Sequence, residues 1–237
     1  MCGRFVLFTT DERLLENVPF ATIEMPYGMP KARYNIAPTQ VIPVLRPAGG
    51  GVGAGAGVGV GAGVGGAVAT EMVLEPARWA LIPHWAKELK GPPLFNARAE
   101  TVASKPSFRE AFKRARCAIP MDGYYEWTGE GEAKHPNFIR TGSPIWVAGL
   151  YSFGLDQLSA TMITTDAQAP LDQVHHRMPR FLAPEEMEQW IFGSPAEAEE
   201  LLTPADTTGF HFTPAPKEVG SVRNDYPELM GLELGES

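Results

Sequence analysis

Cys2 is the residue of this sequence whose position offers the most chemistry. Initiator methionine is generally removed when the second residue is small, so we expect a mature chain that begins with Cys2. Its α-amino group, with a pKa of about 7.7 to 8.0, and its thiol, with a pKa of about 8.5, would both be partly nucleophilic at neutral pH. Such a 1,2-aminothiol attacks an aldehyde through nitrogen and then closes through sulfur to a thiazolidine ring.

Three polar segments supply candidate partners for Cys2. Residues 96–101 (NARAET) read as an ordered loop that carries Asn96, an amide that donates and accepts hydrogen bonds at once. Glu126 lies between aromatic residues after a strand, where a partly desolvated carboxyl group suits acid and base catalysis. His175, His176 and Arg177 precede a further apolar run. Each segment alone also has an ordinary structural explanation.

The elements that must position these residues are mostly strands. Alternating or apolar runs predict strands over residues 2–8, 41–45, 77–82, 115–120, 137–140, 144–151 and 160–165. Residues 10–16, 105–114 and 184–192 predict short helices, opened by capping residues or proline. Many strands and few helices without β–α alternation favour an α+β fold, with a largely antiparallel mixed sheet or a β-barrel-like core and a few short peripheral helices.

Length and composition favour one domain over residues 1–237, of which 44% are hydrophobic. Residues 48–69 contain only Gly, Ala and Val, and we interpret them as an inserted flexible loop. They lack the Gly-Lys-Ser/Thr ending of a phosphate-binding loop. No glycine-free apolar run of about 18 residues exists, and the N-terminus does not resemble a secretory signal, so we expect a cytosolic protein without membrane contact.

The formal net charge of −8 is unevenly distributed. Residues 185–237 hold 12 acidic and 2 basic residues, which leaves 16 acidic and 18 basic residues in positions 1–184. The body of the chain is therefore mildly cationic and can bind phosphates if its arginines cluster. We interpret the acidic C-terminal segment, from about residue 193, as a solvated helix and tail; a partner-binding surface is the alternative.

The sequence gives little support for a metal or another cofactor. Its histidines, His84, His135, His175, His176 and His211, show no His-Glu-x-x-His spacing. Cys2 and Cys117 form no Cys-x-x-Cys pair, and we expect neither a structural disulfide nor a zinc site. The apolar surroundings of Cys117 predict a buried, inert thiol. We expect no metal and no cofactor.

Together, the motifs resemble those of the SOS response-associated peptidase (SRAP) family, also called the abasic-site processing family. The matching strings, in the family's order, are residues 1–5 (MCGRF), 34–39 (YNIAPT), 78–85 (RWALIPHW), 96–101 (NARAET), 116–127 (RCAIPMDGYYEW) and 175–179 (HHRMP). The resemblance implies an α+β fold with a barrel-like core and a positively charged channel. It also implies a monomeric, bacterial-type cytosolic protein, nucleoid-associated when it is crosslinked to abasic sites in single-stranded DNA.

The resemblance also assigns roles to residues. Cys2 becomes the nucleophile, Asn96 holds the N-terminus or the sugar oxygens, Glu126 shuttles protons, and His175 assists formation or reversal of the imine. For DNA binding, Arg4, Arg98 and Arg177 become phosphate contacts, and Trp79 stacks on bases beside the lesion.

This chain departs from the family pattern at Ala80, at His176, where an aspartate is common, and in the 48–69 tract.

Two other functions remain open at this stage. In the first, Cys2 is the N-terminal nucleophile of a cysteine peptidase or amidase, with Asn96 as oxyanion donor and removal of Met1 as its mildest form. In the second, the protein binds nucleic acid without catalysis, which would not require an N-terminal aminothiol. Adduct formation with abasic single-stranded DNA separates all three hypotheses.

Overall fold

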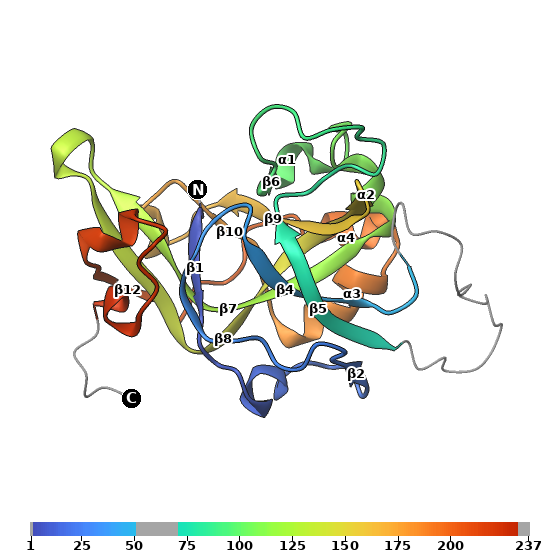
Figure 1. The fold of residues 1–237 in the computed structure, drawn as a ribbon, viewed down its shortest axis with the longest axis horizontal. Helices are drawn as coiled ribbons and strands as arrows, with labels where there is room; N and C mark the ends of the chain where they lie inside the picture. The colour runs from blue at the N-terminus through green and yellow to red at the C-terminus, as the bar shows by residue number, and fades with distance from the viewer. Residues whose placement is uncertain (1, 51–70, 232–237) are drawn as a thin grey trace.

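The computed structural model describes residues 2–50 and 71–231, and its strands belong to one twelve-stranded sheet (Figure 1). The strands are β1 (Arg4–Leu7), β2 (Ile23–Glu24), β3 (Arg33–Ile36), β4 (Val41–Pro47), β5 (Met72–Trp79), β6 (Asn96–Arg98), β7 (Arg116–Thr128), β8 (His135–Gly154), β9 (Gln157–Asp166), β10 (Arg177–Pro179), β11 (Phe181–Leu182) and β12 (His211–Pro214). The helices are short: α1 (Ala99–Val102), α2 (Arg109–Arg114), α3 (Met187–Phe192) and α4 (Pro195–Glu200). Single turns of 3-10 helix include η1 (Glu12–Leu15), η3 (Leu171–Gln173), η4 (Pro184–Glu186), η5 (Lys217–Gly220) and η6 (Pro227–Met230).

Most strand pairs are antiparallel, which confirms the predicted α+β class with a largely antiparallel mixed sheet. The parallel pairs are β2 with β5, β5 with β9, and β6 with β9. The long strand β8 pairs with both β7 and β9, and further pairings join β9 to β5, β5 to β4, and β4 to β7. These pairings return to β8, so the sheet curls around the core.

The core lies inside this curled sheet, and α2, α3 and α4 pack together over β7 and β8. The sequence of β7 explains the packing, because its residues from Arg116 to Glu126 are all buried. A strand covered on both faces reads as a continuous apolar run, as residues 117–121 do. Trp190 of α3 fixes the helix to β7, since its indole donates to the Cys117 carbonyl at 2.9 Å.

A register shift between Met121 and Gly123 interrupts the pairing of β7 with β8. Gly123 is required there, because a Cβ atom would lie 2.6 Å from the Ile139 carbonyl oxygen. Such a bulge redirects the side chains that follow it. Beyond the shift, regular pairing resumes and places Glu126 opposite Asn137.

The structure corrects several element predictions. Residues 137–140 and 144–151 belong to the single strand β8, and residues 96–101 form β6 and α1 instead of a loop. The predicted helix over residues 105–114 becomes α2 only from Arg109. The predicted strand over residues 77–82 ends at Trp79. The predictions near residues 2–8, 41–45 and 160–165 are confirmed as β1, β4 and β9.

The first residue of the 48–69 tract extends a pair of strands. Ala48 donates its backbone N–H to the Glu71 carbonyl at 2.8 Å, which continues the antiparallel pairing of β4 and β5. The prediction of a flexible loop over residues 51–69 lies outside the described residues.

Within the acidic C-terminal segment, residues 217–231 pack against the sheet, unlike the solvated helix and tail that we predicted. Asn35 of β3 donates from Nδ2 to the Val219, Ser221 and Asn224 carbonyls at 3.2, 3.0 and 2.8 Å. Asp225 accepts backbone hydrogen bonds from Tyr34 and Asn35 at 2.6 and 3.1 Å. Residues 217–231 are therefore fastened to β3, and we refer to them as the C-terminal strap.

No helix in the described ranges is long and apolar enough to cross a bilayer.

Candidate active site at the start of β1

Cys2 lies directly before β1, and its side chain is 0% exposed. Its backbone carbonyl accepts a hydrogen bond from Asn96 Nδ2 at 2.7 Å. Asn96 opens β6, whose parallel pairing with β9 sets Asn96 opposite Met162. The other amide atom, Asn96 Oδ1, is buried and has no hydrogen-bond partner within residues 2–50 and 71–231. The start of the chain is thus fixed against β6, beside an acceptor that can still take a hydrogen bond.

Glu126 reaches the same place from β7. Its side chain is buried, and its Oε1 accepts the backbone N–H of Trp127 at 3.2 Å. Burial raises the pKa of the Cys2 thiol well above its usual range, and the negative charge of Glu126 adds to this rise. The Cys2 thiol is therefore uncharged at neutral pH in this environment.

His175 completes the group from the turn between η3 and β10. Its Nδ1 accepts the backbone N–H of Arg177 at 2.9 Å, so the proton of the neutral ring sits on Nε2. Burial lowers the pKa of His175, and the carboxylate of Glu126 opposes that effect. The imidazole is accordingly neutral at pH 7, and Glu126 interacts electrostatically with both His175 and Cys2.

The fold thus brings together four predicted site residues that are far apart in the sequence. Cys2 precedes β1, Asn96 starts β6, Glu126 lies near the end of β7, and His175 precedes β10. The site holds an amide, a carboxylate and a neutral imidazole around one thiol. This set can donate, accept and relay protons during nucleophilic addition.

Tyr124 is a site neighbour that sequence reasoning missed. It precedes Glu126 by two residues on β7, so both side chains point to the same face of the strand. Burial raises its pKa well above the usual value, and Cys2 and Glu126 contribute to the rise. The signal that could have found it is the two-residue period of the strand.

The predicted DNA-binding residues lie in very different environments. Arg98 is exposed at the end of β6, two residues from Asn96. Arg4 is partly buried and donates to the Asn35 side chain at 3.1 Å and to the carbonyls of Val219 and Gly220 at 2.5 and 3.2 Å. Arg4 therefore holds the C-terminal strap as well as lying near Cys2.

The structure contradicts base stacking by Trp79, which is 0% exposed. Its indole donates to the Phe95 carbonyl at 2.9 Å and its ring packs edge-on against Phe5 and Phe95. Trp79 is a core residue, and neither ring face is accessible to a base. An apolar aromatic at the end of a strand reads equally well as core or as stacking platform, so sequence alone misassigned it.

The guanidinium of Arg177 is buried, with its side chain 6% exposed. It forms two hydrogen bonds with Glu100, at 2.6 and 3.1 Å, and one with Asp166 at 2.7 Å. These carboxylates occupy the donors with which Arg177 would contact phosphate. In this structure Arg177 ties β10 to α1 and β9, and a phosphate contact would require the carboxylates to move.

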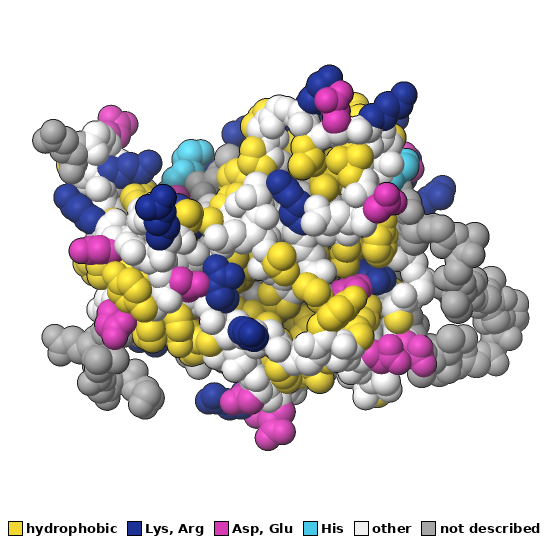
Figure 2. Space-filling model, viewed as in Figure 1, with side chains coloured by type: hydrophobic (Ala, Val, Ile, Leu, Met, Phe, Trp, Pro, Cys, Tyr) yellow, Lys and Arg dark blue, Asp and Glu magenta, His cyan; other side chains and the backbone are white. Residues whose placement is uncertain are grey.

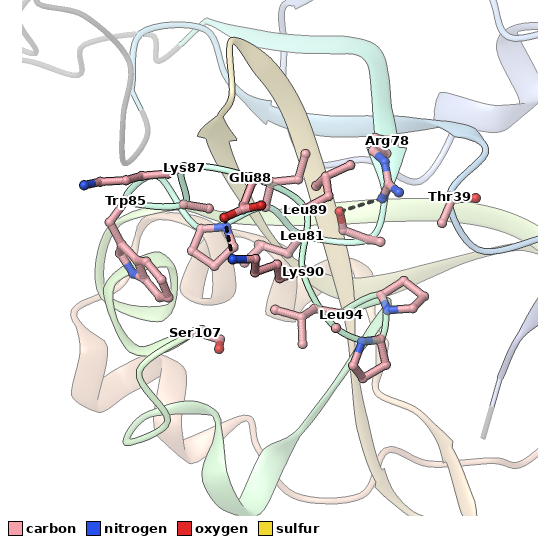
Figure 3. A pocket seen from close by; sticks show the side chains of 17 residues that line it. Thr39, Arg78, Leu81, Trp85, Lys87, Glu88, Leu89, Lys90, Leu94 and Ser107 are labelled. Atoms are coloured by element: carbon pink, nitrogen blue, oxygen red, sulfur yellow. Dashed lines mark hydrogen bonds and ion pairs between the residues drawn. The ribbon is translucent and has the colours of Figure 1, made fainter.

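An open groove borders the loop between β5 and β6 (Figure 3). Its volume is about 670 Å³, and Trp85, Lys87, Leu89 and Lys90 project around it. Trp85 is 57% exposed, and the loop that carries it leads directly to Asn96. Trp85 lies in a motif of the sequence but was not among the predicted site residues.

The surface around the site carries charges of both signs. On the face shown in Figure 2, Lys and Arg side chains are interspersed with Asp and Glu and do not gather into one basic patch. Within the part of the chain that the structure describes, no group of three or more His, Cys, Asp or Glu side chains could hold a metal ion.

The fold and the site define a class of protein: a mixed-sheet domain that buries a cysteine at its N-terminal end among an amide, a carboxylate and a histidine. The family model for the SOS response associated peptidase (SRAP) matches residues 1–222. The chain belongs to this family.

Several named relatives support the assignment. The chain is 32% identical over 242 residues to abasic site processing protein YoqW of Bacillus subtilis, covering 97% of this chain and 99% of that one. It is 30% identical over 245 residues to abasic site processing protein YedK of Escherichia coli, covering 97% and 99%. A crystal structure of a protein from Bacteroides thetaiotaomicron shares the fold, with a TM-score of 0.71, 23% identity, and coverage of 98% of this chain and 100% of that one.

Proposed function

We propose that this protein processes abasic sites by forming a covalent thiazolidine crosslink between Cys2 and the ring-opened sugar in single-stranded DNA. The observation that carries the proposal is the convergence of Asn96, Glu126 and His175 on Cys2. The names of the relatives, which are abasic site processing proteins, support the choice of substrate.

The reaction needs removal of Met1 and then proceeds in two additions. The α-amino nitrogen of Cys2 attacks C1 of the sugar aldehyde, and the carbinolamine loses one water to give an imine. The sulfur then adds to the same carbon, and its proton passes to the nitrogen. One C–N bond and one C–S bond form, and one water is released, so no oxidant or reductant is required.

The raised pKa of the Cys2 thiol fits this order of steps. A thiol that stays protonated at neutral pH competes poorly for the aldehyde, so the amine reacts first. The imine then holds its carbon next to the sulfur, where the addition is intramolecular and needs little thiolate.

The positions of Asn96, Glu126 and His175 suggest a step of the reaction for each. Asn96 donates a hydrogen bond to the Cys2 carbonyl at 2.7 Å. Its Oδ1 can accept a hydrogen bond from the α-amino group, which would orient the nitrogen lone pair toward the aldehyde carbon. Glu126 acts on both Cys2 and His175, which suits a group that protonates the leaving hydroxyl of the carbinolamine. His175, neutral at pH 7, takes the proton of the attacking nucleophile.

Intact mass spectrometry tests the proposal. The protein is measured before and after incubation with a single-stranded oligonucleotide that carries one abasic site. We expect a chain without Met1 and, with DNA, a denaturant-resistant adduct of the summed masses less one water. Cys2→Ala keeps an amine and lacks the sulfur, so we expect only an imine that needs borohydride for trapping. Cys117→Ala, which removes the other buried thiol, is the matched control and should crosslink normally.

Two outcomes would overturn this assignment. A stable adduct of Cys2→Ala without borohydride would remove the thiazolidine from the mechanism. Cleavage of an intact peptide by a mature protein that forms no DNA adduct would favour the peptidase alternative. The Asn96 hydrogen bond speaks against self-removal of Met1, because Nδ2 donates to the carbonyl of Cys2 and the scissile carbonyl would be that of Met1.

A further inference from the structure

The imidazole of His175 is covered by a second histidine. The rings of His175 and His176 are stacked, with centroids 4.2 Å apart and an interplanar angle of 24°. Adjacent residues in a regular strand point to opposite faces, so this arrangement belongs to the turn between η3 and β10. The backbone of His176 is held in place, because its carbonyl accepts the N–H of Ala167 at 3.0 Å.

The stack has an inner and an outer member. His175 is partly buried and lies within the site, whereas His176 is exposed to solvent. A positive charge on the outer ring lies directly against the inner ring and lowers the pKa of His175. Two like charges at this separation repel each other even in water.

We propose that His176 is a positioning residue that keeps His175 in its neutral, proton-accepting form at mildly acidic pH. The catalytic role of this effect rests on the function proposed above, whereas the effect of His176 on the pKa of His175 does not depend on DNA.

The hydrogen bond of His175, like the stacked ring of His176, favours the neutral form of the imidazole. The neutral ring carries its proton on Nε2, so a second proton must go to Nδ1. Nδ1 already accepts the backbone N–H of Arg177 at 2.9 Å, and this donor cannot rotate away. Protonation of His175 therefore costs a hydrogen bond in addition to the repulsion from His176.

Other charged groups around His175 act in both directions. Glu126 from β7 favours the imidazolium, and burial and His176 oppose it. From β10, the guanidinium of Arg177 is neutralised by Glu100 of α1 and Asp166 of β9. The positive charge of the chain terminus acts with His176 and also lowers the pKa of His175. The charge at position 176 therefore acts against the charge of Glu126 at His175.

NMR titration of the histidine Cε1–H resonances tests the inference without DNA. We expect His176→Asp to raise the pKa of His175 by about half a unit or more, because an anion replaces a cation at this distance. His176→Phe keeps a stacked ring without charge and should raise the pKa by less. His211→Asp, which makes the same exchange on β12 outside the site, is the control and should leave His175 unchanged.

The rate of crosslinking then gives the catalytic readout. If neutral His175 accepts the proton, the acidic limb of the pH–rate profile moves to higher pH in His176→Asp, with an unchanged plateau at alkaline pH. An unaltered pKa of His175 in His176→Asp would overturn the inference, even if the wild-type protein crosslinks DNA. If the wild-type protein forms no crosslink but the pKa shifts as expected, the proposed function fails and the tuning by His176 stands.

Discussion

Burial does not distinguish the candidate nucleophile Cys2 from Cys117. Both are completely buried, and in both burial raises the pKa of the thiol above its usual range. They differ in their neighbours. Cys117 lies on β7 opposite Gly149 of β8, in the apolar core, whereas Cys2 lies against Asn96 and Glu126. The partners, and the adjacent α-amino group, distinguish the candidate nucleophile from the inert thiol.

At the residue scale, Arg98 is the predicted phosphate contact best placed for DNA. It is exposed at the end of β6, two residues beyond Asn96. We expect Arg98→Gln to weaken capture of abasic single-stranded DNA several-fold and to lower the salt slope of binding by about 0.7, the loss of one phosphate contact.

Binding measured across a series of salt concentrations checks this prediction. Arg109→Gln is the matched control, since Arg109 is an exposed arginine at the start of α2 and the change removes the same charge from another part of the molecule. An equal loss in both variants would mean that net charge, and not a contact at position 98, governs binding.

At the element scale, one ion pair joins the turn before α3 to the sheet. Arg180 follows β10 and is 2% exposed, and it contacts Glu186 of η4 at 2.7 and 3.0 Å and the Leu201 carbonyl at 2.6 Å. Burial opposes ionisation of Glu186, but Arg180 outweighs it, and the pKa of Glu186 is lowered. Removing this carboxylate leaves a buried cation with fewer partners.

We therefore expect Glu186→Gln to lower the free energy of unfolding at pH 7 by about 1 to 3 kcal/mol. Because the folded pKa is below the unfolded value of about 4.3, the stabilisation is present above that pH and is lost as the pH falls through the folded value. Urea unfolding at pH 7 and at pH 3 should show a difference between variant and wild type that shrinks on acidification. Glu185→Gln, its exposed neighbour, should behave like wild type at both pH values.

The C-terminal strap is joined to the sheet, whereas the sequence analysis predicted a solvated helix and tail for this segment. Asp225 joins it to β3 through the backbone of Tyr34 and Asn35 and through the side chain of Arg33. We expect Asp225→Ala to speed hydrogen exchange over residues 217–231 while the exchange of β7 and β8 stays slow. Glu228→Ala, an exposed change in the same strap, should not do so. Faster exchange across the whole sheet would show that the strap and the sheet unfold as one unit.

At the scale of the whole molecule, the 48–69 tract interrupts a hairpin that is already closed by the Ala48 to Glu71 hydrogen bond. We expect replacement of residues 51–70 by Asn-Gly to leave crosslinking unchanged and to stabilise the fold by about 1 kcal/mol, because a shorter loop costs less closure entropy. Thermal unfolding and the adduct assay check both parts. A loss of crosslinking with a retained melting temperature would give the tract a role in the reaction.

The fold class was predictable from local patterns, and specific motifs pointed to the residues that the fold gathers around Cys2. Apolar runs such as residues 117–121 indicate buried strands, and the strings around Asn96, Glu126 and His175 are distinctive. Elements of two to four residues, such as β2, β10 and β11, are stabilised by pairing with distant strands and leave no local period.

The surroundings of Trp79, Arg4 and Arg177 in the folded protein were not predictable for a related reason. The type of a residue does not show whether a tryptophan or arginine side chain contacts a carbonyl, a carboxylate or a nucleic acid. Only the tertiary structure shows that Phe95, Val219 and Glu100 have taken those positions.

The register shift at Gly123 has a consequence for how this family can change in length. Side chains alternate along a strand, so inserting or deleting one residue between Gly123 and Glu126 would turn the carboxylate from Cys2 toward the opposite face. The hairpin joining β4 and β5 carries no such constraint. Residues inserted between Ala48 and Glu71 lie beyond the last hydrogen bond of the strand pair and leave its register unchanged. Length variation among descendants of this gene should therefore collect between β4 and β5, and this part of β7 should keep its number of codons.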